Sequence, residues 1–313
     1  MDSRRLFQSN LFAMILLTLY AVTPAFLVPV FKSAKLPIAL YLVLPQVLLL
    51  IVPTIIYFIV TKQPIKDTLK LNKISFKTVL IVIVIGLLAQ PIAMFLSLIT
   101  QFVFPNRISQ VVASLNDIPF IIRLGVVALT PAICEEITMR GVVLSGYKNI
   151  SIRKSAIMTG LFFGMLHLDG NQLLYAFAIG IIFAYLVRIT NSIFSSMLCH
   201  FTINGTQVAM SELSTKLMKL SGQQVETIQQ SGLASLSTMQ IINTFFLLLT
   251  LAIICTGIIV LLMQKLSYSY KVYRVNNIDY EKENTNVINW PVIVSIIIYV
   301  VTIFFQLKEI YKW

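Results

Sequence analysis

The chain has 313 residues, of which 58% are hydrophobic and 12% are charged, and its formal net charge is +12. Ordinary soluble domains carry about 25% charged residues, so this composition excludes a soluble protein and indicates an integral membrane protein in contact with a lipid bilayer. The excess of lysine and arginine does not indicate a nucleic-acid partner, because these residues lie in short connections between apolar segments.

Long apolar segments recur along the chain, and a window of about 19 residues locates them. All are expected to be helices, because an open strand leaves backbone groups unpaired in lipid and no alternating barrel pattern is present. The nine expected spans lie near 11–31, 37–61, 77–103, 118–146, 153–168, 171–189, 191–211, 238–264 and 290–309. The sequence therefore predicts an all-α fold, a polytopic transmembrane helical bundle.

The basic residues between the spans predict the orientation of this bundle. With a cytoplasmic amino terminus, marked by Arg4 and Arg5, fifteen of the 24 lysines and arginines fall on the inner side and eight on the outer side. Because basic residues concentrate in cytoplasmic loops, this excess predicts a cytoplasmic amino terminus.

The segment 131–140 is unusual because it places two adjacent glutamates and an arginine within an apolar run. An ionisable group at the centre of a membrane helix costs roughly 2.5–3.5 kcal/mol, so such groups indicate a functional site that faces the protein interior. Glu136 and Arg140 are four residues apart and can pair along one helix face, whereas Glu135 is rotated by about 100°. We therefore expect Glu136 to hold Arg140 and Glu135 to face a cavity.

The two histidines of the chain, His167 and His200, lie in nearby apolar segments. With a rise of ~1.5 Å per residue, both histidines and Glu135 lie on the order of 14–21 Å from the inner ends of their helices, so the three can converge in one layer. Helical spacing also places Phe163 on the face of His167, and Asn204 on the face of His200.

Three kinds of chemistry are compatible with this set of residues, and sequence spacing does not separate them. Glu135 can be a general base that activates water, with His200 and Asn204 stabilising the oxyanion. Glu135, His167 and His200 can instead bind a catalytic zinc ion, although no H-E-x-x-H motif is present. A transporter would use the same groups to relay protons or to bind cations. A thiol nucleophile is disfavoured, because the cysteines next to Glu135 and His200 face about 100° away from them.

Three motifs follow one another on neighbouring predicted helices: Glu135-Glu136-x-x-x-Arg140, Phe163-x-x-x-His167 and His200-x-x-x-Asn204. Together they closely resemble the motifs of the CPBP (Abi) family of intramembrane proteases, which includes type II CAAX prenyl endopeptidases and bacteriocin-processing or immunity proteins. Met139 departs from the phenylalanine that many members have before the arginine. The resemblance divides the chain into amino-terminal transmembrane helices (1–117), a CPBP-like catalytic core (118–210) and carboxyl-terminal transmembrane helices (211–313).

The resemblance implies a conical cavity that faces the cytoplasm, in which Glu135 activates water. The other site residues would be Glu136, Arg140, Phe163, His167, His200 and Asn204. It leaves the cofactor open between zinc and none, and it does not predict the oligomeric state. The expected protein is an endopeptidase of a bacterial cell membrane, whose partner is a lipidated or hydrophobic peptide or a membrane-bound protein. The alternatives are a non-cleaving scaffold or bacteriocin-immunity protein and, less favoured, an ion-coupled transporter.

Overall fold

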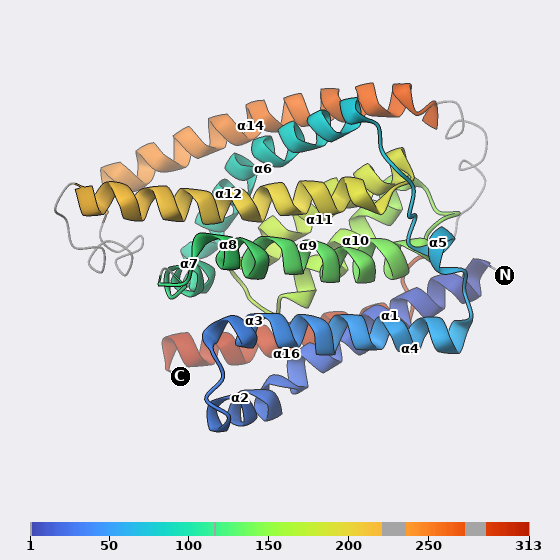
Figure 1. Ribbon diagram of the computed structural model, residues 1–313, viewed down its shortest axis with the longest axis horizontal. Coiled ribbons are helices and arrows are strands. Elements are labelled where there is room, and N and C mark those ends of the chain that lie inside the picture. Colours follow the sequence, from blue (N-terminus) through green and yellow to red (C-terminus); the bar gives the residue numbers. More distant parts are fainter. Residues whose placement is uncertain (1, 116, 221–235, 273–285, 313) are drawn as a thin grey trace.

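The computed structural model describes residues 2–115, 117–220, 236–272 and 286–312 (Figure 1). Every regular element in these ranges is a helix, which confirms the predicted all-α class. The α-helices are α1 (Asp2–Val22), α2 (Pro24–Ser33), α3 (Ile38–Gln46), α4 (Val52–Thr61), α5 (Ile65–Thr68), α6 (Phe76–Gln101), α7 (Arg107–Ala113), α8 (Phe120–Arg123), α9 (Thr130–Glu136), α10 (Ile152–Leu166), α11 (Gln172–Thr190), α12 (Ile193–Leu220), α14 (Thr238–Ser269) and α16 (Trp290–Tyr311). Three π-helical segments are inserted between them: η1 (Val47–Ile51), η2 (Leu124–Leu129) and η3 (Ile137–Val143).

Six helical segments of the described chain are long and apolar enough to cross a membrane. They are Ser3–Val22, Ile38–Thr61, Phe76–Gln101, Gln172–Thr190, Thr238–Ser269 and Trp290–Tyr311. The expected spans 118–146, 153–168 and 191–211 are also helical, but they do not meet the same criteria of length and hydropathy as single helices. The sequence therefore placed helices in all nine segments, while the structure identifies six as candidate spans.

The first expected span, 11–31, has the wrong limits. Helix α1 begins at Asp2 and ends at Val22, and a second helix, α2, begins at Pro24. Proline has no backbone N–H to donate to the preceding turn, so it is favoured as the first residue of a new helix. The expected span begins at residue 11 because a hydropathy window does not detect a helix that extends beyond the apolar region.

The helix that carries the glutamate motif is built from four consecutive segments, α8, η2, α9 and η3, which follow one another without a loop. Its π-helical segment η2 precedes Pro131, and Thr130 Oγ1 donates to the carbonyl of Gly125 at 2.9 Å. π-helical turns commonly occur at functional sites, where they alter which backbone groups are paired.

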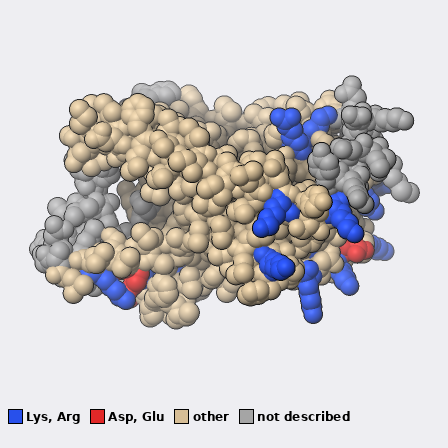
Figure 2. Space-filling model, turned by 90° about the horizontal axis from the view of Figure 1, so that it is seen from above, with Lys and Arg blue, Asp and Glu red and all other residues tan. Residues whose placement is uncertain are grey.

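Lysine and arginine side chains gather at one end of the bundle, which we name the basic end (Figure 2). The amino terminus of α1, the carboxyl terminus of α4, and α5 lie at this end (Figure 1). The basic residues at this end belong to the start of α1, the segment from the end of α4 to the start of α6, the connection into α10, and the ends of α11 and α14. They are Arg4, Arg5, Lys62, Lys66, Lys70, Lys73, Lys77, Lys148, Arg153, Lys154, Arg188, Lys265 and Lys271. We name the opposite end, which holds α2 and α7, the α7 end.

Candidate functional site

Glu136 and Arg140 form a fully buried ion pair one helical turn apart. Arg140 Nη1 lies 3.2 Å from Glu136 Oε1, and neither side chain is exposed. This contact confirms the expectation that Glu136, rather than Glu135, pairs with the arginine. Because a buried charge is costly without a partner, the pair determines the position of both side chains.

Arg140 is further held by helix α11 and by two aromatic rings. Its Nη2 donates to the carbonyl of Gly180 at 3.1 Å, and its guanidinium carbon lies 4.2 Å from the ring centre of Phe163 and 5.0 Å from that of Phe183. Gly180 is necessary for this approach, since a Cβ atom there would lie 2.9 Å from Gly160 Cα and 3.2 Å from Arg140 Nη2.

His200 is held between the two glutamates. Its Nδ1 lies 3.1 Å from Glu136 Oε1, and because the carboxylate accepts, Nδ1 carries the hydrogen. The imidazole stacks on Phe183 at 5.0 Å between ring centres and 27° between planes. Its other nitrogen, Nε2, lies 3.9 Å from Glu135 Oε2. Glu136 therefore fixes the tautomer of His200 and directs Nε2 toward Glu135.

Glu135 has one paired and one unpaired oxygen. Its Oε1 accepts a hydrogen bond from Gln46 Nε2 of α3 at 3.0 Å. Its Oε2 is buried and has no hydrogen-bond partner among the described residues. Leaving such an oxygen unpaired costs free energy, so it is suited to bind a proton or a water molecule from the cavity. Sequence reasoning did not identify Gln46, although a lone amide within the apolar segment 37–61 was a signal for it.

Phe163 stands between the two histidines. Its ring makes edge contacts with His167 at 5.0 Å and with His200 at 6.0 Å, with interplanar angles of 89° and 88°. The Nδ1 atom of His167 lies 2.8 Å from the carbonyl oxygen of Phe163, which can only accept. His167 therefore has the same tautomer as His200, but it is not brought into contact with the glutamates.

The turn after His167 is fixed by the last helix of the chain. Gln306 of α16 donates from Nε2 to Asp169 Oδ2 at 2.9 Å and accepts from the Gly170 N–H at 3.0 Å. Asp169 Oδ1 in turn accepts from the Gln172 N–H at 3.0 Å, at the start of α11. The sequence motifs gave no indication that α16 contacts the site.

Asn204 is held by the helix that carries the glutamates. Its Nδ2 donates to the carbonyl of Val127 at 3.1 Å. In an uninterrupted α-helix that carbonyl would accept from the amide of residue 131, which is proline and has no hydrogen to donate. One hydrogen of the Asn204 amide is used in this bond, and the other is available to a ligand.

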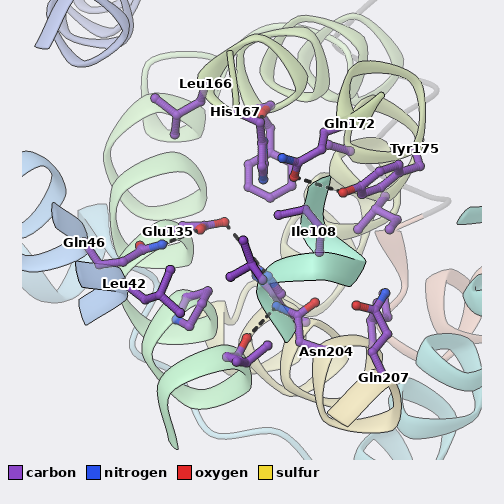
Figure 3. Close-up of a pocket in the computed structure, with 18 of the residues that line it drawn as sticks. Leu42, Gln46, Ile108, Glu135, Leu166, His167, Gln172, Tyr175, Asn204 and Gln207 are labelled. Carbon is purple, nitrogen blue, oxygen red and sulfur yellow. Dashed lines mark hydrogen bonds and ion pairs between the residues drawn. The ribbon is translucent and has the colours of Figure 1, made fainter. Parts of the chain in front are cut away.

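These side chains line a cavity of about 280 Å³ (Figure 3). Glu135, Phe163, His167, His200 and Asn204 all contribute to its wall. The rest of the lining is apolar or neutral and polar, and includes Leu42, Gln46, Ile108, Gln172, Tyr175, Ile179 and Gln207. The structure thus links Glu135, Glu136, Arg140, His200 and Phe163 in one chain of contacts, in which Glu135 is joined through His200. It places His167 and Asn204 on the same cavity.

The three residues considered as zinc ligands are not arranged as a metal site. No group of three or more His, Cys, Asp or Glu side chains among the described residues could hold a metal ion. Glu135 and His200 are close enough to share a ligand, but the ring of Phe163 lies between His167 and His200. The donor set in this arrangement does not fit a His₂Glu zinc site, which is one of the alternatives that the sequence leaves open.

Comparison with known proteins agrees with the motifs. No curated protein and no solved structure matches the chain. Residues 117–206 match the family model of the type II CAAX prenyl endopeptidase Rce1-like proteins. The matched range contains every site residue expected from the sequence, from Glu135 to Asn204. The resemblance identified in the sequence is therefore confirmed over residues 117–206, which are similar to the type II CAAX prenyl endopeptidase Rce1-like proteins.

Proposed function

We propose that this protein is an intramembrane endopeptidase that hydrolyses a peptide bond in a hydrophobic or lipidated peptide or in a membrane-bound protein. The observation that carries the proposal is the Oε2 atom of Glu135, which is buried, unpaired and 3.9 Å from His200 Nε2 on the wall of a cavity. A carboxylate in this setting is a suitable general base for water, because it has a free acceptor atom in a site of low dielectric constant.

In the proposed mechanism Glu135 Oε2 takes a proton from a water molecule, and the water oxygen attacks the carbonyl carbon of the substrate. The carbonyl oxygen becomes an oxyanion, which the second N–H of Asn204 and a protonated His200 Nε2 stabilise. The C–N bond then breaks, and the proton held by Glu135 passes to the leaving amine. Phe163 shapes the cavity beside the reacting groups.

The charges of the cluster support this role for His200. Glu135 and Glu136 supply two negative charges, and Arg140 supplies one positive charge. A proton on His200 Nε2 makes the buried cluster neutral, which lowers its cost in a low-dielectric interior. Glu136 and Arg140 are thus positioning residues, which hold His200 through its Nδ1 atom.

We propose further that the whole chain has the membrane topology that its sequence predicts. The amino terminus is cytoplasmic in a bacterial cell membrane, nine helical segments cross it, and the core 118–210 is flanked by transmembrane helices in 1–117 and 211–313. The network between Gln306 and Asp169 supports a contribution of the last helix to the core.

The test is cleavage of hydrophobic peptides by the purified protein in liposomes, with products identified by mass spectrometry. Wild type and Asp67→Asn, a control with an exposed carboxylate on α5 that does not line the cavity, should cleave alike. Glu135→Gln and His200→Ala should lose at least 100-fold in turnover, as expected for the loss of a general base. Equal turnover in all four proteins would refute the proposal. A scaffold or immunity protein would instead keep its cellular effect after Glu135→Gln.

A further inference from the structure

The cavity extends from the layer of Glu135 and His200 to the α7 end of the bundle. Its outer wall includes Tyr20 near the end of α1, Leu42 of α3 and Gln172 at the start of α11. Helix α1 begins at the basic end, so its last turns lie at the α7 end (Figure 1). Helix α7 itself contributes Ile108, which lies in front of the cavity in Figure 3.

The opposite direction, toward the basic end, is filled with side chains. Met139, Val142, Val143 and Tyr147, which follow Glu136 along the chain toward the basic end, are at most 1% exposed. No residue of this group lines the cavity.

The segment that follows α5 closes the basic end over these residues. Leu69 packs on Gly141 so tightly that a Cβ atom added to Gly141 would lie 2.3 Å from Leu69 Cδ2. The carbonyl of Lys70 accepts from the N–H of Ile193 at 3.1 Å, which ties the connection after α5 to the start of α12. A peptide therefore cannot reach Glu135 from the basic end without displacing packed side chains.

The charge distribution relates these two ends to the two sides of the membrane. The basic end collects most of the lysine and arginine residues of the described chain (Figure 2). At the α7 end, Arg107 pairs with Glu309 at 3.3 Å, and both Arg123 and Lys216 pair with Glu212. Because basic residues are retained on the cytoplasmic side, the basic end is cytoplasmic and the α7 end faces outward.

A cytoplasmic amino terminus and a cavity open to the cytoplasm, both expected from the sequence, are therefore incompatible in this fold. We infer that the cavity opens on the extracytoplasmic side of the membrane, at the α7 end, and receives substrate from that side. The orientation is independent of catalysis, whereas the identity of the occupant as a substrate rests on the proposed function.

This orientation defines the class of substrate. Among the described residues, no lysine or arginine lines the cavity. The groups between its mouth and Glu135 are mostly apolar side chains, together with the amides of Gln46, Gln172 and Gln207 and the hydroxyls of Tyr20 and Tyr175. Such a lining suits an uncharged, apolar stretch of peptide whose backbone forms hydrogen bonds with these glutamine amides. The substrate is thus an apolar segment of a peptide or membrane protein exposed on the outer face, rather than a tail lipidated in the cytoplasm.

Cysteine labelling in intact cells tests the orientation without any activity. The three native cysteines are buried, so the wild type measures background labelling by a membrane-impermeant maleimide. Lys35→Cys, which is exposed at the α7 end, and Gln207→Cys, which lines the cavity, should be labelled in intact cells. Lys148→Cys, exposed at the basic end, should be labelled only after the cells are permeabilised.

Labelling of Lys148→Cys in intact cells, or protection of Lys35→Cys there, would overturn the orientation. Labelling of Lys35→Cys without labelling of Gln207→Cys under any condition would overturn the opening of the cavity at this end. The substrate class is tested with an impermeant apolar peptide, which right-side-out vesicles should cleave at least 10-fold faster than inside-out vesicles. Absence of cleavage in both, with labelling as expected, would reject the proposed function and leave the orientation intact.

Discussion

Asn204 donates its side-chain hydrogen bond to the carbonyl of Val127, the group that in an uninterrupted α-helix would accept from residue 131 if that residue were not proline. Pro131→Ala supplies an N–H that competes with Asn204 for this carbonyl. We expect kcat to fall about 10-fold, roughly the effect of about 1.4 kcal/mol in the transition state, with little change in KM or in thermal stability. Steady-state kinetics and a thermal melt in detergent measure both quantities.

Pro53→Ala, in the first turn of α4, is the matched control and should leave kcat unchanged. If Pro131→Ala cleaved at the wild-type rate, the carbonyl of Val127 would not be what positions Asn204.

Removal of Glu136 and removal of Glu135 should have different effects on the stability of the fold. Glu136→Ala leaves Arg140 and His200 without their shared acceptor, and breaking a buried ion pair costs about 3–5 kcal/mol, so the melting temperature should fall by several degrees. Glu135→Ala removes only the acceptor of Gln46, so the fold should be nearly as stable as the wild type while turnover is lost. Equal melting temperatures for the two variants would contradict these separate roles.

Close packing of α10 on α11 should depend on Gly180. Gly180→Ala places a methyl group 2.9 Å from Gly160 Cα, and overpacking of this kind costs about 1–3 kcal/mol. It should also displace Arg140 and lower turnover. Gly257→Ala is the control, because its added methyl group meets no atom within 4 Å and alanine favours a helix by about 1 kcal/mol. A thermal melt should show opposite shifts for the two variants.

The sequence predicted the part of the site that depends on local geometry. The pairing of Glu136 with Arg140 follows from a spacing of four residues on one helix, which the backbone enforces whatever the tertiary fold. The three family motifs also lie on one cavity. The contacts of Gln46, Phe183 and Gly180 were not predictable, because they come from other helices and depend on how the helices pack.

The direction of the cavity shows a second limit of the sequence. The charge bias indicated the orientation of the helices, and the depth estimate placed Glu135 and the histidines near mid-membrane. Neither quantity indicates whether side chains fill the space above or below that layer. Only the packing of Met139, Val142 and Tyr147 shows which end is closed.

Helix α16 should contribute to activity through the turn after His167. Gln306→Leu removes the donor to Asp169 and the acceptor of the Gly170 N–H, and each buried polar group left unpaired costs about 1–3 kcal/mol. We expect both a lower melting temperature and a lower turnover, since His167 lies next to this turn. Thr302→Val, on the same helix, is the control, because its hydroxyl bonds only to the carbonyl of Ile298. Unchanged kinetics in Gln306→Leu would show that the turn does not need α16.

The central claim is that Glu135 activates water for peptide hydrolysis. The most direct measurement is the rate at which ¹⁸O from labelled water enters the new carboxyl group of a cleaved hydrophobic peptide, for wild type and for Glu135→Gln in liposomes. We predict one ¹⁸O per cleavage in the wild type and at least a 100-fold slower reaction in Glu135→Gln, which keeps the shape of the side chain but not its basicity. Cleavage by Glu135→Gln at the wild-type rate would contradict the claim.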